Sequence, residues 1–374
     1  MKFEIIDTLT KFNELESEWR KLFFNSDHNE NIFASFDWHK AVLQSYQPLY
    51  KDGKYKLAIV VGRRSDKVEL ICPLVLVKSF GARILNWIGN PVSQYGDMIV
   101  RPGKAGADII DEALKFVALE TKADALVLER VQEMSAVVAT LKRDSAMPLR
   151  QRKAPLLNLE DVKSADRYFA GLSAARRKKH RRLWRRLCER GPAKFEILNP
   201  GPDALAWTRR ALQLKKQNLI EQGTYSRAFS NSYFEPFFHA LAEGKDANVG
   251  YQAGILTCND KLIAAELGFR CNGAYIAHIG VYDPAYKKYA PGHLLMERML
   301  RHSIEKGVKR YDFLAPQDEF KSAWQNESAK VIDFGLPLTK AGQLYCTILK
   351  MAHPTADMLK RTLPSSLMRF AANK

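Results

Sequence analysis

The sequence predicts a protein of the α/β class, in an α+β arrangement, built as two consecutive domains. In each domain we expect helices to flank a mixed, largely antiparallel and twisted sheet. The chain has 374 residues, which is long for one domain and comfortable for two. The same order of elements also occurs twice: helices, an antiparallel meander, a helix and another strand, without a residue-level repeat. We place the domains at residues 1–155 and 156–336, followed by a basic helical tail at residues 337–374.

The composition indicates a globular protein with a basic surface. Hydrophobic residues make up 46% and charged residues 26%, which excludes a disordered chain, and the formal net charge is +17. A basic surface attracts anionic partners without identifying them. The five cysteines are widely spaced, odd in number and form no CxxC pair. We therefore expect a reducing compartment, with neither a zinc site nor a disulfide framework.

Targeting segments and familiar catalytic motifs are not found in the sequence. The N-terminal residues lack the apolar core of a signal peptide, and no run of about 18 apolar residues offers a transmembrane helix. We therefore expect a cytoplasmic protein. No Ser-His-Asp order or Walker-type loop stands out, and the eight histidines show no HxH or HExxH spacing, so no metal is expected.

The elements of the first domain follow from apolar spacing and from turn and cap residues. Ser35 has the position of a helix N-cap, and Ser65 and Asp66 form a turn between two apolar runs, which predicts a hairpin. In chain order we expect a strand at 3–6, a helix at 13–24, a helix after Ser35, strands at 56–62, 68–77 and 83–88, a helix at 105–120, a strand at 125–129 and a loop around 147–155.

The second domain repeats this order, with two strong hairpin turns, at Asn259-Asp260 and Asn272-Gly273. Alternation along the strand at 274–282 predicts that Ile276, His278, Gly280 and Tyr282 share one face. In chain order we expect a strand at 156–159, helices at 162–172 and 173–189, a strand at 194–198, helices at 204–221 and 232–243, strands at 249–257, 262–270 and 274–282, a helix at 291–306 and a strand at 310–314. The tail is expected to be helical and interrupted at Pro354 and Pro364.

The segment at residues 173–191 concentrates the basic charge, with nine Lys or Arg and one acid. Helical spacing gathers Leu183, Trp184 and Leu187 into an apolar stripe with the charges around it. Three interpretations stay open. In the first, the segment is a solvated helix face, and the aliphatic parts of its Lys and Arg side chains cover apolar surface. In the second, it lines a groove for a sugar diphosphate or lipid-linked diphosphate. In the third, it contacts RNA.

The start of the helix at 291–306 has the features of a phosphate site. A loop with Lys287 and Lys288 leads into Pro291, Gly292 and His293. A helix start carries unpaired N–H groups and a positive dipole end, Pro suits the first turn, and Gly lets a ligand approach the backbone. The alternative is an ordinary amphipathic helix with Pro in its first turn.

This order of strand, loop, helix and strand resembles the core of the GNAT-type N-acetyltransferases. Their pyrophosphate loop has the form Q/R-x-x-G-x-G/A, which Lys287-x-x-Ala290-x-Gly292 resembles with Lys for Gln or Arg and Ala for Gly. Ala290 costs little if it keeps an ordinary φ.

Five segments together resemble a specific branch of that superfamily, the CelD/BcsL-like acyltransferases of bacterial polysaccharide gene clusters, and more distantly the Fem-type peptidoglycan aminoacyltransferases. The resemblance runs from about residue 15 to residue 335 and implies two tandem GNAT-like domains, with acyl-CoA bound in the second. The segments are SFDW with LICPLVLV, SQYGDMIV, LSAARRKKHRRLWRRL, YDPAYKKYAPG and YDFLAPQDEFKSAW.

The resemblance also implies roles for individual residues. Lys321, in the FKSAW box, is implied to stabilise the transferred carbonyl, although a surface helix lysine is the alternative. Three roles are open for Asp318: it holds Lys321 by an ion pair, it acts as a base, or it caps a helix. His278 is either a general base near neutral pH or a hydrogen-bonded core histidine. Glu266 lies in an apolar strand, and we expect it to face outward.

Two further sets of residues complete the expected site. The residues expected to bind the cofactor are Lys287, Lys288, Tyr289, Ala290, Gly292 and His293. The residues expected to line the substrate groove are Tyr95, Asp97, Arg177, Arg181, Asp312 and Trp324.

The sequence thus leads to a cytoplasmic acyltransferase that moves an acetyl or similar group directly from coenzyme A to an amine or hydroxyl of a sugar-containing acceptor in polysaccharide or cell-envelope biosynthesis. Direct transfer is expected because no cysteine lies in a recognisable catalytic dyad. One alternative is a Fem-like transferase that uses aminoacyl-tRNA. The other is a non-enzymatic scaffold, docked peripherally on the inner membrane by the basic helix and the tail. DNA is not an expected partner.

Overall fold

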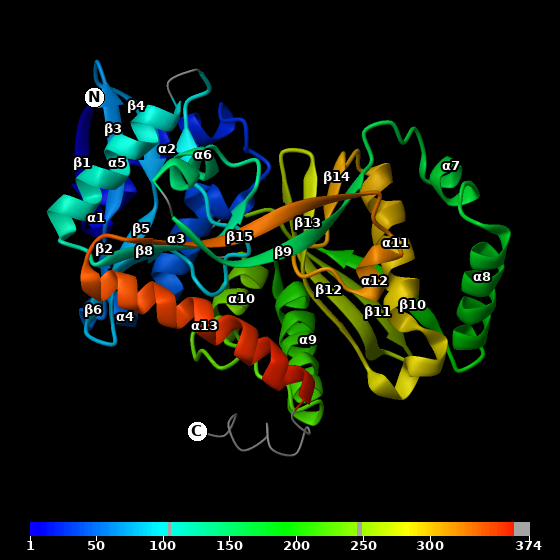
Figure 1. Ribbon diagram of the computed structural model, residues 1–374. Helices are drawn as coiled ribbons and strands as arrows, with labels where there is room; N and C mark the ends of the chain where they lie inside the picture. Colours follow the sequence, from blue (N-terminus) through cyan, green and yellow to red (C-terminus); the bar gives the residue numbers. More distant parts are fainter. Residues whose placement is uncertain (104–105, 145, 245–248, 363–374) are drawn as a thin grey trace. The chain divides into compact units, whose positions relative to one another are not determined.

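The computed structural model describes residues 1–103, 106–144, 146–244 and 249–362 (Figure 1). These residues form two compact units, one with Met1–Lys153 and the chain after Ser328, the other with Ala154–Ser328. We call them unit 1 and unit 2. The chain returns to unit 1 after residue 328, whereas the sequence analysis assigned residues 156–336 to one domain and residues 337–374 to a tail.

Unit 1 contains a small antiparallel sheet and part of a second sheet. The small sheet has the order β1 (Lys2–Ile6), β3 (Ile59–Arg64), β4 (Lys67–Cys72) and β7 (Ile99–Val100). The second has the order β15 (Glu327–Pro337), β8 (Ala125–Gln132), β6 (Ala82–Trp87), β5 (Leu74–Ser79) and β2 (Tyr55–Leu57), with β6 and β8 parallel.

The predicted hairpin of the first domain supplies strands to both of these sheets. Its turn is confirmed, with Ser65 and Asp66 at φ 46° and 62°, as such turns require. Each of its two predicted strands is divided in two, at Ala58 and Pro73, and Pro cannot donate to a ladder hydrogen bond. β3 therefore pairs with β4, and β2 with β5.

The first helices of unit 1, up to residue 45, pack around buried aromatic side chains, among them Trp19 and Trp38, which are fully buried. The predicted cap is confirmed, because the Ser35 hydroxyl accepts a hydrogen bond of 3.2 Å from the Trp38 N–H. The helices are α1 (Leu9–Glu14), α2 (Glu16–Phe24), the 3-10 turn η1 (Ile32–Ala34), α3 (Phe36–Ser45), α4 (Gln47–Lys51), α5 (Gly106–Thr121), α6 (Ala136–Arg143) and α13 (Lys340–Thr362). α13 continues through Pro354, so the predicted interruption there is wrong; Pro364 lies outside the described residues.

Unit 2 is a mixed sheet with helices on both faces. Its strand order is β10 (Ala193–Leu198), β11 (Tyr251–Cys258), β12 (Lys261–Cys271), β13 (Ala274–Tyr282), β14 (Arg310–Asp312) and the end of β9 (Met147–Asn158). Its helices are α7 (Ala165–Ala170), α8 (Ala174–Cys188), α9 (Pro202–Glu221), α10 (Phe234–Glu243), the 3-10 turn η2 (Pro284–Tyr289), α11 (Pro291–Glu305) and α12 (Glu319–Ser322). The loop predicted around 147–155 is wrong, since β9 runs through it, and β15 was not predicted.

Helices α9 and α11 cover opposite faces of the sheet in unit 2. Leu294 and Met299 of α11 pack in one core with Tyr275 of β13. On the other face, Thr208 of α9 shares a hydrogen bond of 2.6 Å with Tyr251 of β11. The side chains of β12 and β13 therefore meet different surroundings on the two faces, which lie against α9 and α11 (the helices labelled in Figure 1).

A β-bulge interrupts the alternation along β13. The register shifts between Leu267 and Gly268 of β12, so that β13 has one extra residue there. Ile276 pairs with Phe269, while Gly280 pairs with Glu266, three positions away on β12. Since partners across a ladder share a face, Ile276 and Gly280 lie on opposite faces. The prediction that residues 276, 278, 280 and 282 share one face is therefore wrong.

Strands β13 and β14 are parallel neighbours for only a short distance. Ala274–Ile276 pairs with Arg310–Asp312, and the two strands then part. From residue 277 to residue 282, β13 has no strand on this side within the described part of unit 2. An open strand edge therefore faces the loop that follows β14.

The basic helix α8 packs as its spacing predicts. Leu183 and Leu187 are buried, and Trp184 lies under the guanidinium of Arg298, 3.5 Å from its ring centre. His180 on the same face contacts Glu297 of α11, with Nδ1 to Oε2 at 2.6 Å. The outer face carries six exposed cations: Lys178, Lys179, Arg181, Arg182, Arg185 and Arg186.

No helix among the described residues is both long and apolar enough to cross a bilayer.

A buried carboxylate joins three strands of unit 1, which gives a test of the fold. Asp333 of β15 is 1% exposed, accepts two hydrogen bonds from the Arg152 guanidinium at 3.0 and 2.6 Å, and accepts one from the Arg130 backbone N–H at 2.7 Å. Asp333→Asn leaves Arg152 without a counter-charge, and we expect it to lower the free energy of unfolding by about 3 kcal/mol in urea denaturation. In a control that removes both charges, Arg152→Met with Asp333→Leu, most of this loss should return. A loss below about 1 kcal/mol for Asp333→Asn would contradict this account.

Candidate functional site

The candidate site lies where β13 and β14 part, and Lys321 reaches it from α12. The Lys321 ammonium donates hydrogen bonds to the carbonyl oxygens of Leu314 and Pro316, at 2.9 and 3.0 Å. Leu314 has a left-handed φ of 59°, and its N–H donates to Asp312 at 2.7 Å, which fixes the turn after β14. Burial lowers the pKa of Lys321, while the nearby carboxylates of Asp318 and Asp312 oppose this shift.

Asp318 has the capping role that the sequence analysis left open. Its carboxylate accepts a hydrogen bond of 2.8 Å from the Lys321 backbone N–H and so caps α12. Its side chain is exposed, and its charge favours the protonated form of Lys321. Asp318 therefore positions the short helix that carries the lysine.

Glu266 is the residue that the sequence analysis placed wrongly. It was expected to face outward, but it is 5% exposed and accepts a hydrogen bond from the Tyr311 hydroxyl. Burial raises the pKa of Glu266 to about 7, although the hydrogen bond from Tyr311 and the charge of Lys321 lower it. The carboxyl group can therefore take up or release a proton near neutral pH, as a general base or acid must. An acid within an apolar strand was the only sign of this in the sequence.

His278 lies on the other side of the sheet from Glu266. Its ring is 5.3 Å from that of Phe238 on α10 and 5.7 Å from that of Phe269 on β12. Phe269 and Glu266 are three positions apart on β12, so they face opposite ways. The structure thus favours the core histidine that the sequence analysis kept as an alternative.

The start of α11 keeps the open backbone that a phosphate site needs. Its first turn has no side-chain cap, and a Cβ placed on Gly292 would touch only the Phe320 ring, at 3.6 Å. Lys287 and Lys288 are exposed just before it. Ala290, however, has φ 49°, so it does not keep the ordinary φ on which its low cost depended. A left-handed residue with a Cβ costs roughly 1–2 kcal/mol.

Tyr289 is buried, and its predicted role in binding the cofactor stays a prediction. Its ring centre lies 5.2 Å from the Lys288 ammonium and 6.0 Å from the Arg186 guanidinium of α8. Two cations from different elements thus gather around one ring beside the start of α11. Arg186 was not among the residues predicted for the cofactor site.

His293 sits in an aromatic cluster at the first turn of α11. Its ring centre is 4.8 Å from Phe320 and 6.3 Å from both Trp324 and His180. Burial, and then the nearby positive charges, lower its pKa to about 4, so His293 is neutral at pH 7. Trp324 is buried beneath the Arg176 guanidinium, which lies 3.9 Å from its ring centre.

The remaining predicted residues of unit 2 have separate environments. Arg177 donates to the carbonyl oxygens of Ala170 and Leu172, so it holds the loop before α8. Arg181 is exposed on the outer face of α8. Asp312 is buried at the end of β14, near Lys321. The structure therefore brings Lys321, Asp312 and Asp318 together with Glu266, and leaves Arg177 and Arg181 on α8.

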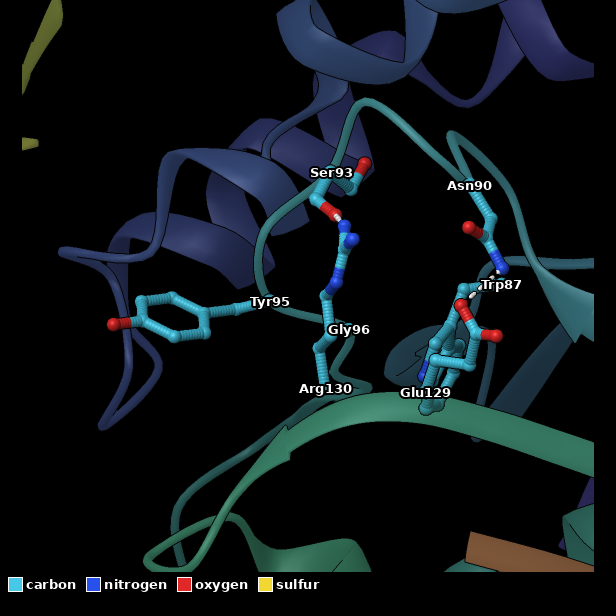
Figure 2. A pocket seen from close by; sticks show the side chains of 7 residues that line it. All are labelled: Trp87, Asn90, Ser93, Tyr95, Gly96, Glu129 and Arg130. Atoms are coloured by element: carbon cyan, nitrogen blue, oxygen red, sulfur yellow. Dashed lines mark hydrogen bonds between the residues drawn. The ribbon is translucent and has the colours of Figure 1, made fainter. Parts of the chain in front are cut away.

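Tyr95 and Asp97 lie in unit 1, where Tyr95 borders a small cavity (Figure 2). Asp97 accepts hydrogen bonds from the Ser135 hydroxyl at 2.5 Å and the Met98 N–H at 2.8 Å, and burial raises its pKa. Figure 2 shows the Arg130 guanidinium donating a hydrogen bond to the Ser93 carbonyl oxygen. This bond holds the loop that also contains Tyr95 and Asp97. The cavity is lined by Trp87, Asn90, Ser93, Tyr95, Gly96, Glu129 and Arg130. Asp97 thus holds the loop, and its predicted role in binding substrate stays a prediction.

Within the described residues, no group of three or more His, Cys, Asp or Glu is placed to hold a metal ion.

Comparison with known proteins bears on the fold and on the segment that holds the site. Residues 174–322, from α8 to α12, match the family model described as "Acetyltransferase (GNAT) domain". The chain matches none of the curated proteins. The crystal structure of FemX is 13% identical, with 94% of this chain and 100% of that chain covered and a TM-score of 0.61.

Two other solved structures have lower scores. L-PGS from Bacillus licheniformis is 11% identical, with 90% of this chain and 95% of that chain covered and a TM-score of 0.53. A conserved protein of unknown function from Bacteroides thetaiotaomicron is 14% identical, with 89% of this chain and 99% of that chain covered and a TM-score of 0.53. At these identities the likeness shows the fold alone. The predicted mixed α/β fold is confirmed, the CelD/BcsL-like subtype stays a prediction, and the segment that contains Glu266 and Lys321 is similar to acetyltransferase (GNAT) domains.

Proposed function

We propose that this protein is a GNAT-type acyltransferase that transfers an acetyl or similar group directly from coenzyme A to an amine or hydroxyl. The acceptor is a sugar-containing molecule of polysaccharide or cell-envelope biosynthesis. The observation that carries the proposal is that buried Glu266 and Lys321, where β13 and β14 part, lie close enough for the charge of each to shift the pKa of the other. An acid and a cation that shift each other's pKa in one place are typical of a catalytic site.

The described residues fit an acyl-CoA along its length. Its phosphates suit the uncapped first turn of α11 at Gly292, with Lys287 and Lys288 beside it. Its extended arm suits the open edge of β13, where strand carbonyls can accept hydrogen bonds. When bound, acyl-CoA supplies an activated thioester carbonyl, and the residues of the chain position it and handle the proton and the charge.

We assign to Glu266 the role of general base, which accepts the proton of the attacking group. With a pKa of about 7, a substantial fraction of its side chains is ionised at neutral pH and can accept the proton that the attacking amine or hydroxyl loses. The Tyr311 hydroxyl, which donates to Glu266, fixes the carboxylate in place. No other described residue near Lys321 combines burial with a pKa in this range.

Lys321 is the group we assign to the developing negative charge. An ammonium has three N–H donors, and two of them donate to Leu314 and Pro316. The third and the positive charge remain for the carbonyl oxygen of the transferred group. A fixed cation in a partly dehydrated site stabilises such an oxyanion strongly.

A second candidate is a transferase that takes an aminoacyl group from tRNA. The six exposed cations of α8 favour it, because such a face attracts the phosphates of RNA. The scaffold alternative is supported by the departures from the pyrophosphate loop at Lys287 and Ala290, the latter with its left-handed φ. Binding of acetyl-CoA together with turnover separates the first proposal from both.

The donor proposal is tested by calorimetric titration with acetyl-CoA. We expect saturable binding by the wild type and binding about tenfold weaker or more in Lys287→Ala with Lys288→Ala, because two charges next to the phosphates are lost. Lys306→Ala, which removes an exposed lysine at the opposite end of α11, serves as the control and should bind like the wild type. No heat and no thermal shift at millimolar acetyl-CoA would refute the donor.

The role of Lys321 is tested by Lys321→Met. We expect the rate of acetyl transfer to fall by about 10²–10³, as when an oxyanion donor is removed, with little change in the affinity for acetyl-CoA. Thiol release from acetyl-CoA in the presence of amino sugars and nucleotide sugars measures the rate. The matched control Lys306→Met, at an exposed helix end, should keep wild-type activity, and a fully active Lys321→Met variant would exclude the role.

Glu266 gives the reaction a predictable pH dependence. Because the base must be ionised, the wild-type rate should rise through pH 7, while Glu266→Gln should stay slow throughout. The free energy of unfolding should change in the opposite direction and fall as the pH rises. The folded-state pKa lies above the ordinary value of 4.5, so the folded protein binds the proton more tightly and loses stability as pH rises from 4.5 to 7.

Glu266→Gln cannot lose a proton, so its stability should not show this fall. Denaturant titrations of both proteins between pH 4.5 and 8 check the difference, with Glu305→Gln as an exposed-acid control. Parallel pH curves for the wild type and Glu266→Gln would show that Glu266 does not titrate in this range.

A further inference from the structure

The open edge of β13 presents two carbonyl groups at its far end. The Asp283 N–H donates to Ile263 of β12 at 2.9 Å, so the backbone at residue 283 points toward β12. Backbone groups alternate sides along a strand, so the carbonyls of Gly280 and Tyr282 point away from β12, to the side that β14 has left. An unpaired edge of this kind is a template for an added extended chain.

Two side chains of α9 donate hydrogen bonds to these carbonyl oxygens. The Lys215 ammonium donates to the Gly280 oxygen at 3.0 Å, and the Asn218 side-chain amide donates to the Tyr282 oxygen at 2.9 Å. Lys215 and Asn218 are three positions apart on α9 and therefore lie on one face of the helix. The carbonyls are two positions apart on the strand, about 7 Å, so one helix face matches two successive acceptors of the edge.

The arrangement at Lys215 differs from that of the neighbouring lysine. Lys216 is exposed and pairs with Glu235 at 3.0 Å, as a helix-surface lysine usually does. Lys215 is instead partly buried; burial lowers its pKa, and the charge of Asp318 opposes this shift. Its hydrogen bond goes to a neutral carbonyl, which is a weaker acceptor than a carboxylate, so this contact is open to competition.

We propose that Lys215 and Asn218 are placeholders, which cover the open edge of β13 in the free protein and withdraw when the acyl donor binds. This inference rests on the proposed function and adds a condition to it. The donor must carry an extended arm whose amide N–H groups can replace the two α9 side chains as hydrogen-bond donors to these carbonyls. A donor without such an arm leaves the placeholders where they are.

The affinity for acetyl-CoA tests the inference. We expect Lys215→Met and Asn218→Ala each to tighten binding a few-fold in calorimetry, and the double variant about tenfold, because the donor no longer displaces a bonded side chain. The control is Lys216→Met, which alters the adjacent exposed lysine and should bind like the wild type. Unfolding midpoints show whether each variant keeps its fold.

A second measurement follows Lys215 directly. Reductive methylation, read by mass spectrometry, should modify Lys215 faster when coenzyme A is present, because the withdrawn amine is exposed, while modification of Lys216 should not change. If the wild type binds acetyl-CoA and the variants bind it equally or more weakly, the placeholder role is wrong and the proposed function stands. If neither the wild type nor the variants bind it, both fail.

Discussion

The parting of β13 from β14 is the constraint on which the candidate site depends. The two strands pair over three residues and then separate, and everything assigned to chemistry lies at or beside that opening. Glu266 stands behind it on β12, Lys321 reaches it from α12, and Gly280 borders it on β13. A continuous ladder would have used these backbone groups for the sheet itself, and no surface for a donor would remain.

Burial of charge at this opening gives the site its chemistry. Glu266 is buried and Lys321 is half-buried, so the acid binds its proton more tightly and the lysine less tightly than usual. Each also favours the charged form of the other, which limits both shifts. In the proposed reaction, the base is held on strand β12 and the cation, which keeps one donor free, is held on the short helix α12.

The sequence predicted the helices and the turns better than the strands. The spacing in α8, the cap at Ser35 and the turn at Ser65 and Asp66 are local signals, and the structure confirms them. β9 was missed because its Met, Pro, Arg and Lys residues have the composition of a loop, while tertiary pairing makes it a strand. The bulge in β13 leaves no local mark, so alternation failed there. Glu266 faces inward because Tyr311, 45 positions away, supplies its partner, and spacing along the sequence cannot show that.

The outer face of α8 has a consequence for how any anion reaches this protein. Six cations stand in solvent there, whereas Glu266 and Lys321 are withdrawn from it. At physiological ionic strength salt screens exposed charges beyond about 8 Å. The distance over which this helix attracts anions therefore becomes shorter as the salt concentration rises. The rate at which an anionic ligand binds should therefore depend on the salt concentration, while the rate of the chemical step should not. The same protein would appear faster in dilute buffer simply because more ligand arrives.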